Sequence, residues 1–508
     1  MYPSLEVFIR EPIFGSIAAT SSVRSVSGRL RAFQRLPLPL GILLTAAVAS
    51  GCFMVGPDYQ SPRPDAPMHW SGPGDTRTPD AAVLAEWWRQ FRDPVLDGLV
   101  ADALAANLDL AAAQAQLREA RARRALAGAQ LGPIVNASAS GSRRRASAES
   151  GNGATAELYS AGFDASWELD VFGGLRRGVE ATEADVGASA DQLRDTRVSL
   201  VAEVALNYVD LRAAERQLVV AEESVTSREE TYKLARWRLQ AGLVSELDVA
   251  QARTDLESTR AALPALRTSA TEARHRLAVL LGRTPGELEA RLVATAAVPL
   301  AADSVAVGIP ADTLRQRPDV RAAERQLAAQ TARLGEAEAA RYPSFSLSGA
   351  LGLEALGLAA LGSSDAVTRS LLGNITAPIF DAGRIDANVA IQDARLEQAR
   401  LAYQSAVLGA FEDVENALVA VANSAERRLQ LESAAVSARD TLQIARHRYA
   451  SGLADFLAVL ESQRTLLSLE EQLAGTTGNL ARAQIQLYKA LGGGWSPDRD
   501  PEPARSSS

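Results

Sequence analysis

The sequence predicts a mixed α/β membrane protein that consists mainly of long α-helices, carries four β-strands in each copy and folds as two similar halves. Three observations lead to this prediction. Residues about 94–283 recur as about 304–493, at an offset of about 210 residues, far longer than the roughly 20–50 residues of a solenoid repeat. Each half contains two short stretches in which apolar and polar residues alternate. Each half also contains long proline-free runs with a helical spacing of apolar residues.

The repeat includes positions that chance matches between helices would not align. Pro133 corresponds to Pro343, and the two copies end on the matching pairs Leu281-Gly282 and Leu491-Gly492. We therefore expect a duplicated structural half. The expected divisions are a signal peptide at 1–51, a lipid anchor with a tether at 52–93, the first half at 94–283, a linker at 284–303, the second half at 304–493 and a C-terminal tail at 494–508.

The composition argues against several classes of function. A formal net charge of −8 and an isoelectric point near 5.3 do not fit a nucleic-acid partner, which usually needs a basic face. The single cysteine excludes an intramolecular disulfide. The three histidines lie far apart, and the sequence has no phosphate-binding glycine loop, no metal-spaced cluster and no nucleophile elbow. We therefore expect no enzyme, no catalytic residue and no metal site.

The N-terminus has the order of a secretory signal. Four arginines between Arg24 and Arg35 precede an apolar run at 36–48, and small residues then lead to Cys52. The apolar run is too short to span a bilayer as a helix. A cysteine directly after small residues resembles the bacterial lipobox, in which the thiol receives a diacylglycerol, so we expect a covalent lipid on Cys52 and no other cofactor. The alternative is a buried cysteine without a function.

The mature chain begins with a segment that cannot be a regular helix. Residues 53–80 contain six prolines, and proline both lacks a backbone N–H and blocks a helix interior. We expect an extended, proline-rich tether there.

Four segments alternate with a period of two residues and are expected to be strands. In the first half, Val135 and Ala137 alternate with Asn136 and Ser138. Such segments, with one apolar and one polar face, are typical of transmembrane barrels. Half-buried strands of a soluble sheet have the same pattern. The expected strands are at about 134–146, 157–172, 343–354 and 367–380.

The remaining segments of each half predict unusually long helices. The run at about 176–239 has apolar residues every seven positions, the spacing of supercoiled helices, and would extend over ~96 Å at ~1.5 Å per residue. Pro264 is expected to kink the helix that follows. A short glycine turn joins the helices of each pair. The expected pairs are about 176–239 with 243–281, and 384–449 with 453–491.

Four strands cannot close a barrel by themselves. An open edge in lipid leaves backbone groups unpaired at several kcal/mol each, and at about eight strands a barrel interior is filled by side chains. A trimer, with a twelve-stranded transmembrane β-barrel, is therefore the smallest assembly expected to contain an aqueous lumen. The same three copies would join their long helices into a helical cylinder, an α-barrel that stands in water because it exceeds the thickness of a bilayer.

Several motifs now resemble one family. The residues that carry the resemblance are Cys52 with Gly56-Pro57-Asp58-Tyr59, the run Trp87-Trp88-Arg89-Gln90-Phe91-Arg92-Asp93-Pro94, Arg317-Pro318-Asp319-Val320, the run 274–282 and the run 486–495. In this order the chain resembles the TolC-like outer-membrane efflux proteins, and among them the OprM-type lipoprotein branch, over about 55–495.

The resemblance implies a concrete function. Members of that family form homotrimers with a twelve-stranded barrel in the outer membrane and a twelve-helix periplasmic tunnel. The tunnel meets a periplasmic adaptor protein and, through it, an inner-membrane pump, of the RND type in this branch. The implied channel passes small toxic compounds to the exterior and does no chemistry.

The resemblance also implies where the adaptor docks. The two glycine turns correspond to the family's periplasmic tips, so Gly242 with Leu243 and Gly452 with Leu453 are candidate docking residues. The neighbouring arginines, Arg238 and Arg448, belong to the same candidate site. The alternative is that these turns only reverse the chain.

A gate is implied beside these tips. In TolC, an aspartate of the first tip helix contacts a tyrosine of the second hairpin, and the corresponding residues are Asp248 and Tyr449. TolC also has two carboxylates that narrow the pore, and here one position is Ala458 and the other is Glu461. Three copies of Glu461 in a narrow pore would favour cations or bound protons. The alternative is that Asp248 and Glu461 are ordinary solvated helix charges.

Two other functions share part of the pattern. A lipid-anchored periplasmic coiled-coil scaffold without a pore would have the heptads and the lipobox, but it does not explain four alternating strands at matching places in the two halves. Within the channel class, the alternative is an outlet for secreted proteins or metal ions.

Overall fold

The computed structural model describes residues 54–63, 67–72, 80–292, 297–301, 306–308 and 310–496. The expected signal peptide and Cys52 lie outside these residues. The described residues form one compact unit. Among the helices of the described ranges, none combines the length and the hydropathy that a membrane crossing requires.

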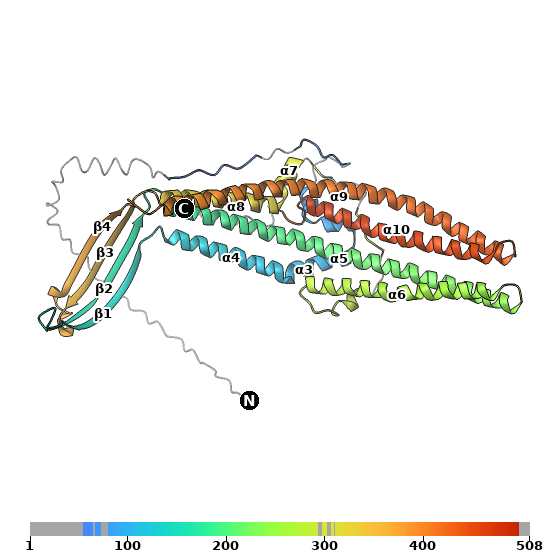
Figure 1. Cartoon of the computed structure of the whole chain (residues 1–508), viewed down its shortest axis with the longest axis horizontal. Helices are drawn as coiled ribbons and strands as arrows, with labels where there is room; N and C mark the ends of the chain where they lie inside the picture. The colour runs from blue at the N-terminus through green and yellow to red at the C-terminus, as the bar shows by residue number, and fades with distance from the viewer. Residues whose placement is uncertain are drawn as a thin grey trace, which may run out of the picture. The chain divides into compact units, whose positions relative to one another are not determined.

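The four strands form one antiparallel sheet in the order β1-β2-β3-β4 (Figure 1). The strands are β1 Ile134–Arg145, β2 Thr155–Leu169, β3 Ser344–Ala355 and β4 Val367–Thr376. The register places Ala137 opposite Phe163, Phe163 opposite Leu351 and Leu351 opposite Arg369. Because side chains alternate along a strand, all odd-numbered strand residues share one face, here called the apolar face. The other face carries mainly Ser, Asn and acidic side chains.

Two strands are shorter than the sequence analysis expected at the ends that lead into the long helices. β2 ends at Leu169 rather than 172, and β4 ends at Thr376 rather than 380. Asp170 instead accepts hydrogen bonds from the backbone N–H groups of Leu175 and Arg176 (3.2 and 2.9 Å). In the second half, Asp381 has a related role and accepts from the backbone N–H groups of Gly383 (3.0 Å) and Ile385 (2.8 Å). These carboxylates satisfy N–H groups that a helix start leaves open, so the residues begin helices and do not extend strands.

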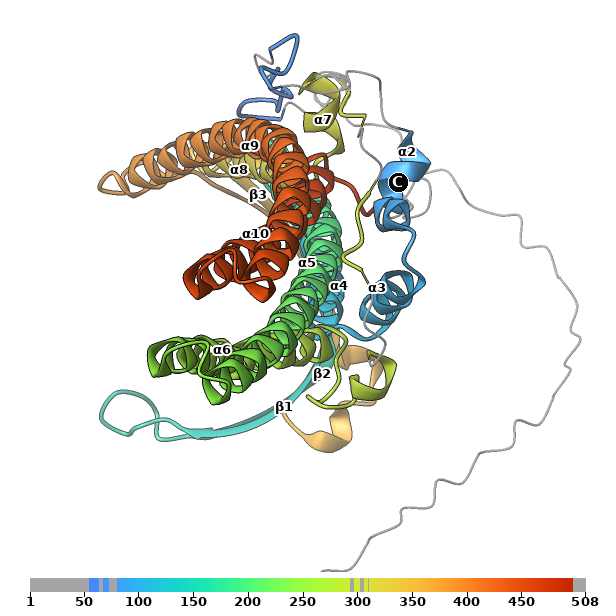
Figure 2. The same cartoon turned by 90° about the vertical axis from the view of Figure 1, so that its right-hand side faces the viewer.

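The long helices have equal lengths in the two halves. α5 (Gly174–Gln240) and α9 (Arg384–Ala450) each contain 67 residues, which corresponds to about 100 Å at ~1.5 Å per residue. α6 (Glu246–Leu280) and α10 (Phe456–Ala490) each contain 35 residues. Figure 2 shows the two hairpins side by side in a curved layer, with α10 next to α5.

The second helix of each hairpin begins three residues later than expected. At α6, the Ser245 hydroxyl and the Asp248 carboxylate form a reciprocal capping box. At α10, the Asp455 carboxylate accepts the N–H of Ala458 at 3.0 Å. These caps fix both starting points. Pro264 lies inside α6, and the helix continues past it.

Shorter helices pack on the long helices between their middle and the end near the sheet (Figure 1). They are α3 (Pro94–Ala106) and α4 (Leu108–Ala129) in the first half, and α7 (Pro310–Gln316) and α8 (Pro318–Ala339) in the second. α4 and α8 both pack on α5. The main core lies where the short helices meet the hairpins. Trp87 is fully buried there and stacks on Tyr488 at 5.2 Å between ring centroids.

The proline-rich segment is extended, but its described part is not a free tether. The buried Arg177 side chain donates to the backbone carbonyl oxygens of Val55 and Gly56 and to the Asp58 carboxylate. Tyr59 donates to Glu324 on α8 at 3.0 Å. Farther on, residues 81–91 form α2 (Ala81–Ala85) and a 3-10 turn (Trp87–Phe91). The tether interpretation of 52–93 was therefore wrong for these parts, because proline excludes a helix but not side-chain contacts to the peptide backbone.

Candidate functional site at the hairpin tips

The turn at each hairpin tip has the same backbone geometry. Gly242 and Gly452 have φ angles of 71° and 74°, a region that favours glycine. The N–H of Leu243 donates to the Arg238 carbonyl, and the N–H of Leu453 donates to the Arg448 carbonyl, both at 2.8 Å. These bonds close the helix ends as a Schellman motif does. A Cβ atom at either glycine would meet no other atom within 4 Å.

The tips carry exposed apolar side chains. Leu243 is 66% exposed and Leu453 is 74% exposed. Leu247 and Leu457, the second residues of the following helices, are also exposed. Two matching pairs of solvated leucines at the end of a hairpin form a surface that another protein can cover.

The two arginines of the candidate docking site have different surroundings. Arg448 is exposed. Arg238 is half-buried, donates a hydrogen bond to the Tyr449 carbonyl at 2.6 Å and lies over the Tyr449 ring at 4.4 Å. This cation–π contact joins the first hairpin to the second, so Arg238 connects the tips within one chain.

Asp248 and Tyr449, expected to contact each other, are not hydrogen bonded in this chain. The Asp248 carboxylate accepts from the backbone N–H and the hydroxyl of Ser245, at 2.9 and 3.0 Å. Tyr449 is buried against Phe456, and within the described chain its hydroxyl has no hydrogen-bond partner. Burial raises the pKa of this hydroxyl, and the Asp248 charge acts in the same direction, against Arg238. Arg238, and not Asp248, is therefore the residue that contacts Tyr449 in one copy of the chain.

Glu461 is exposed on α10, one turn before Arg464. Its charge favours the protonated form of Arg464, whose pKa is raised mainly by its hydrogen bonds to Asp255. The carboxylate is thus available to a solvent-filled space.

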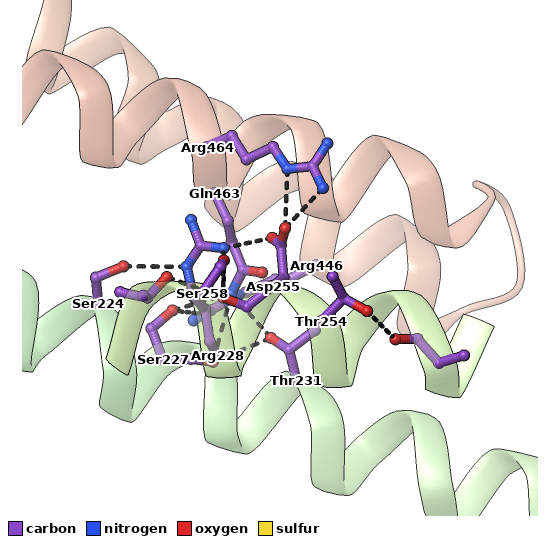
Figure 3. Close-up of polar contacts among 12 residues, drawn as sticks. Ser224, Ser227, Arg228, Thr231, Thr254, Asp255, Ser258, Arg446, Gln463 and Arg464 are labelled. Atoms are coloured by element: carbon purple, nitrogen blue, oxygen red, sulfur yellow. Dashed lines mark hydrogen bonds and ion pairs between the residues drawn. The ribbon is translucent and has the colours of Figure 1, made fainter. Parts of the chain in front are cut away.

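The sequence analysis missed a buried polar cluster close to these residues (Figure 3). Asp255 on α6 is 5% exposed and binds two arginines. Arg228 on α5 forms an ion pair with one of its carboxylate oxygens. Arg464 on α10 binds the other through two nitrogens, at 3.0 and 2.6 Å. Burial lowers the pKa of Arg228, and the Asp255 charge opposes that shift.

Gln463 continues this cluster from α10 to α5. Its amide nitrogen donates to the hydroxyls of Ser227 and Thr231 at 3.0 and 2.9 Å. Arg446 on α9 also contacts the Ser227 hydroxyl. Polar side chains therefore connect all four helices of the two hairpins at one level.

One signal in the sequence could have identified the cluster. At the offset of 210, Arg228 corresponds to Ala438, Asp255 to Thr465 and Arg464 to Thr254. The charges stand where the duplicated half has small uncharged residues, so they break the repeat at three positions that meet in space.

Comparison with known proteins identifies similar sequences and a similar fold. The family model described as outer membrane efflux protein matches residues 99–283 and 309–493. The toluene efflux pump outer membrane protein TtgC of Pseudomonas putida is 34% identical over 471 residues, covering 90% of this chain and 95% of TtgC. The probable outer membrane lipoprotein SilC of Salmonella typhimurium is 32% identical over 464 residues, covering 90% and 99%. The solved structure of the outer-membrane channel OprN superposes with a TM-score of 0.83 at 36% identity, covering 87% of this chain and 99% of OprN.

Proposed function

Because the chain belongs to the outer membrane efflux protein family, we propose that three copies of it form a single exit duct for small toxic organic compounds. The chain is an outer-membrane channel of an efflux system and not an enzyme. The number of copies, the substrate class and the partners are the proposed parts. Both the sheet and the helices support them.

The main support for three copies comes from the sheet. Within the described part of one copy, the two edge strands, β1 and β4, have no neighbour on their outer sides. In lipid, each unpaired backbone group costs several kcal/mol, so β1 of one copy has to pair with β4 of the next. Three copies of a four-stranded sheet give twelve strands, and barrels of more than about eight strands leave room for an aqueous lumen.

The two faces of the sheet fit a barrel in lipid. The apolar face has exposed Phe163, Leu351, Leu371 and Ile375, which suits contact with hydrocarbon. The opposite face has Asn136 hydrogen bonded to Asp164 at 3.2 Å. This polar face lines the proposed lumen.

The helices have an uncovered apolar stripe that a neighbouring copy would bury. The stripe lies along α9 and consists of Ile391, Leu401, Leu408, Val419, Leu429, Val436 and Ile444, all between 46% and 67% exposed. Solvated apolar residues repeated over the length of a helix mark a contact surface for another helix.

The proposed partners follow from the hairpin tips. A periplasmic adaptor docks on the exposed leucines and Arg448, and an RND-type inner-membrane pump supplies the energy. Asp248, Tyr449 and Glu461 form the gate behind the docking surface. A lipid on Cys52 anchors the N-terminal segment, whose residues 54–59 are held by Arg177 and Glu324. The relation to a toluene efflux protein supports small organic compounds as the substrate class.

Outer-membrane extracts from cells that express the full chain test this function. We expect a trimer-sized species that heating converts to single chains, and resistance to organic solvents and dyes when the cognate pump and adaptor are expressed as well. A folded single-copy protein would contradict the proposal. Resistance to metal ions alone would assign the channel to a different substrate class.

A further inference from the structure

The apolar face of the sheet has an unusual distribution of charge. Among the odd-numbered residues of the four strands, four carry side chains that are charged at neutral pH: Arg143, Arg145, Glu157 and Arg369. All four lie toward the strand ends farthest from the helices, where β1 turns into β2 and β3 turns into β4. In a barrel, this end faces the outside of the cell, and the apolar face contacts the outer leaflet.

The register of the sheet determines how these arginines meet when copies join. Val367, at the start of β4, is level with Leu353, Ala161 and finally Ala139 on β1. β1 continues to Arg145, which is 145 − 139 = 6 residues beyond that level. If the outer ends of β1 and β4 are paired where two copies meet, β1 of one copy is shifted by these six residues relative to its level in its own sheet.

With that pairing, arginines would meet at the seam, defined here as the contact between β4 of one copy and β1 of the next. Arg369 is level with Ala137 in its own copy, and a shift of six residues would place it opposite Arg143 of the neighbouring copy. The shift is even, so both side chains remain on the apolar face. Arg145 follows two residues farther out on the same face.

Directly opposed like charges destabilise a pair of strands, so the seam needs an anion. Glu157 supplies one carboxylate, which lies 3.4 Å from the Arg143 guanidinium, but the Arg143 side chain is still 75% exposed. An exposed pair of this kind contributes only about 0–1 kcal/mol. Two of the three arginines at each seam have no carboxylate opposite them on this face.

We propose that each seam binds the phosphate groups of the phosphorylated glycolipid in the outer leaflet, and this rests on the trimer of the proposed function. Guanidinium groups form bidentate hydrogen bonds with phosphate oxygens. Leu371, two residues from Arg369 on the same face, is 78% exposed and would contact the acyl chains below the phosphates. An arginine at this height costs only about 0–1 kcal/mol, against ~2–4 kcal/mol at the bilayer centre.

Arg144 provides a matched control. It lies between Arg143 and Arg145 in the sequence, is also exposed, and points to the polar face. R144Q therefore removes the same charge from the same strand without touching the seam.

Binding to the purified full-length trimer tests the proposal, with diphosphoryl lipid A, phosphatidylglycerol and inorganic phosphate as separate probes. We expect lipid A to bind preferentially, R143Q and R369Q each to weaken its binding about tenfold, R144Q to leave it unchanged, and E157Q to tighten it. Equal binding of phosphatidylglycerol or of inorganic phosphate would overturn the proposal, as would equal losses in R144Q and R369Q. A protein that purifies as single copies would overturn the trimer and the seam together, whereas a trimer indifferent to lipid A would overturn the seam site alone.

Discussion

Arg464 on α10 binds Asp255 on α6 through two nitrogens, at 3.0 and 2.6 Å, and so links the second hairpin to the first. Asp255 is buried and also pairs with Arg228, which is 4% exposed. The carboxylate thus lies between a buried cation and a cation that is half in solvent.

This arrangement predicts unequal effects of substitution. Asp255→Ala leaves Arg228 buried without its carboxylate, which typically costs about 3–5 kcal/mol. Arg464→Gln removes a side chain that is 52% exposed, so its loss should cost no more than about 1 kcal/mol. Urea unfolding followed by circular dichroism measures both. Equal losses would show that the exposed Arg464 contributes as much to stability as the buried carboxylate itself.

The same pair makes a prediction about the gate. Arg464→Gln frees α10 from α6 near the tips, so we expect a larger single-channel conductance in planar bilayers while the trimer remains intact. Arg439→Gln is the control, because Arg439 forms a similar exposed ion pair with Glu470 at 2.8 Å within the second hairpin. An increase in both variants would assign the effect to general loosening of the helices.

Docking at the tips predicts an effect of Gly242 and Gly452 on resistance. A tryptophan at either position costs roughly 1–2 kcal/mol for its left-handed backbone, and the open space around each glycine leaves room for the side chain. We expect Gly242→Trp and Gly452→Trp to form trimers in the outer membrane and to lose drug resistance.

Gly286→Trp is the matched control for those variants. Gly286 has a φ of 100° and open space around it, but it lies in the loop after α6, far along the chain from the tip. Resistance should survive there. Loss of the trimer in the tip variants would instead favour a purely structural role of the turns.

The repeat explains why much of this fold could be predicted from the sequence. Alternation and heptad spacing are local properties, and the duplication supplies each of them twice, as the helix caps Ser245 and Asp455 at equivalent positions illustrate. The resemblance to the efflux family is confirmed by the family model over both halves. The gate residues and docking tips remain predictions.

Contacts between distant segments could not be predicted in this way. The cluster around Asp255 depends on which face of α6 lies against α10, and no periodicity within either helix determines that. The attachment of residues 54–59 to Arg177 depends on backbone carbonyl groups, which every sequence has. Both features involve buried arginines, and the packing of the helices determines which groups these arginines bind.

Glu461 predicts the ion selectivity of the channel. Three copies of this exposed carboxylate near the pore axis would attract cations, so Glu461→Gln should reduce the cation-over-anion permeability ratio measured from reversal potentials. Glu289→Gln is the control, since Glu289 is exposed in the short 3-10 turn that follows α6. An unchanged ratio in Glu461→Gln would place the carboxylate outside the pore.

Asp195 on α5 predicts a pH dependence of stability. Burial raises the pKa of this carboxyl above its usual 3.8, and the nearby Asp319 adds to the shift, while Lys489 and Arg317 oppose it. A carboxyl whose pKa is higher in the folded state binds protons more readily when folded, so stability decreases as the pH rises from about 3.8 through the folded pKa. Above that range the Asp195 carboxylate is charged while it is buried, which lowers the free energy of unfolding. Asp195→Asn removes this cost, so it should raise the unfolding temperature at pH 7, and the gain should shrink as the pH falls toward 3.8.

The exposed loop variant Asp365→Asn is the control. A gain that stays constant with pH would mean that the asparagine stabilises the site through new hydrogen bonds and not through the lost charge.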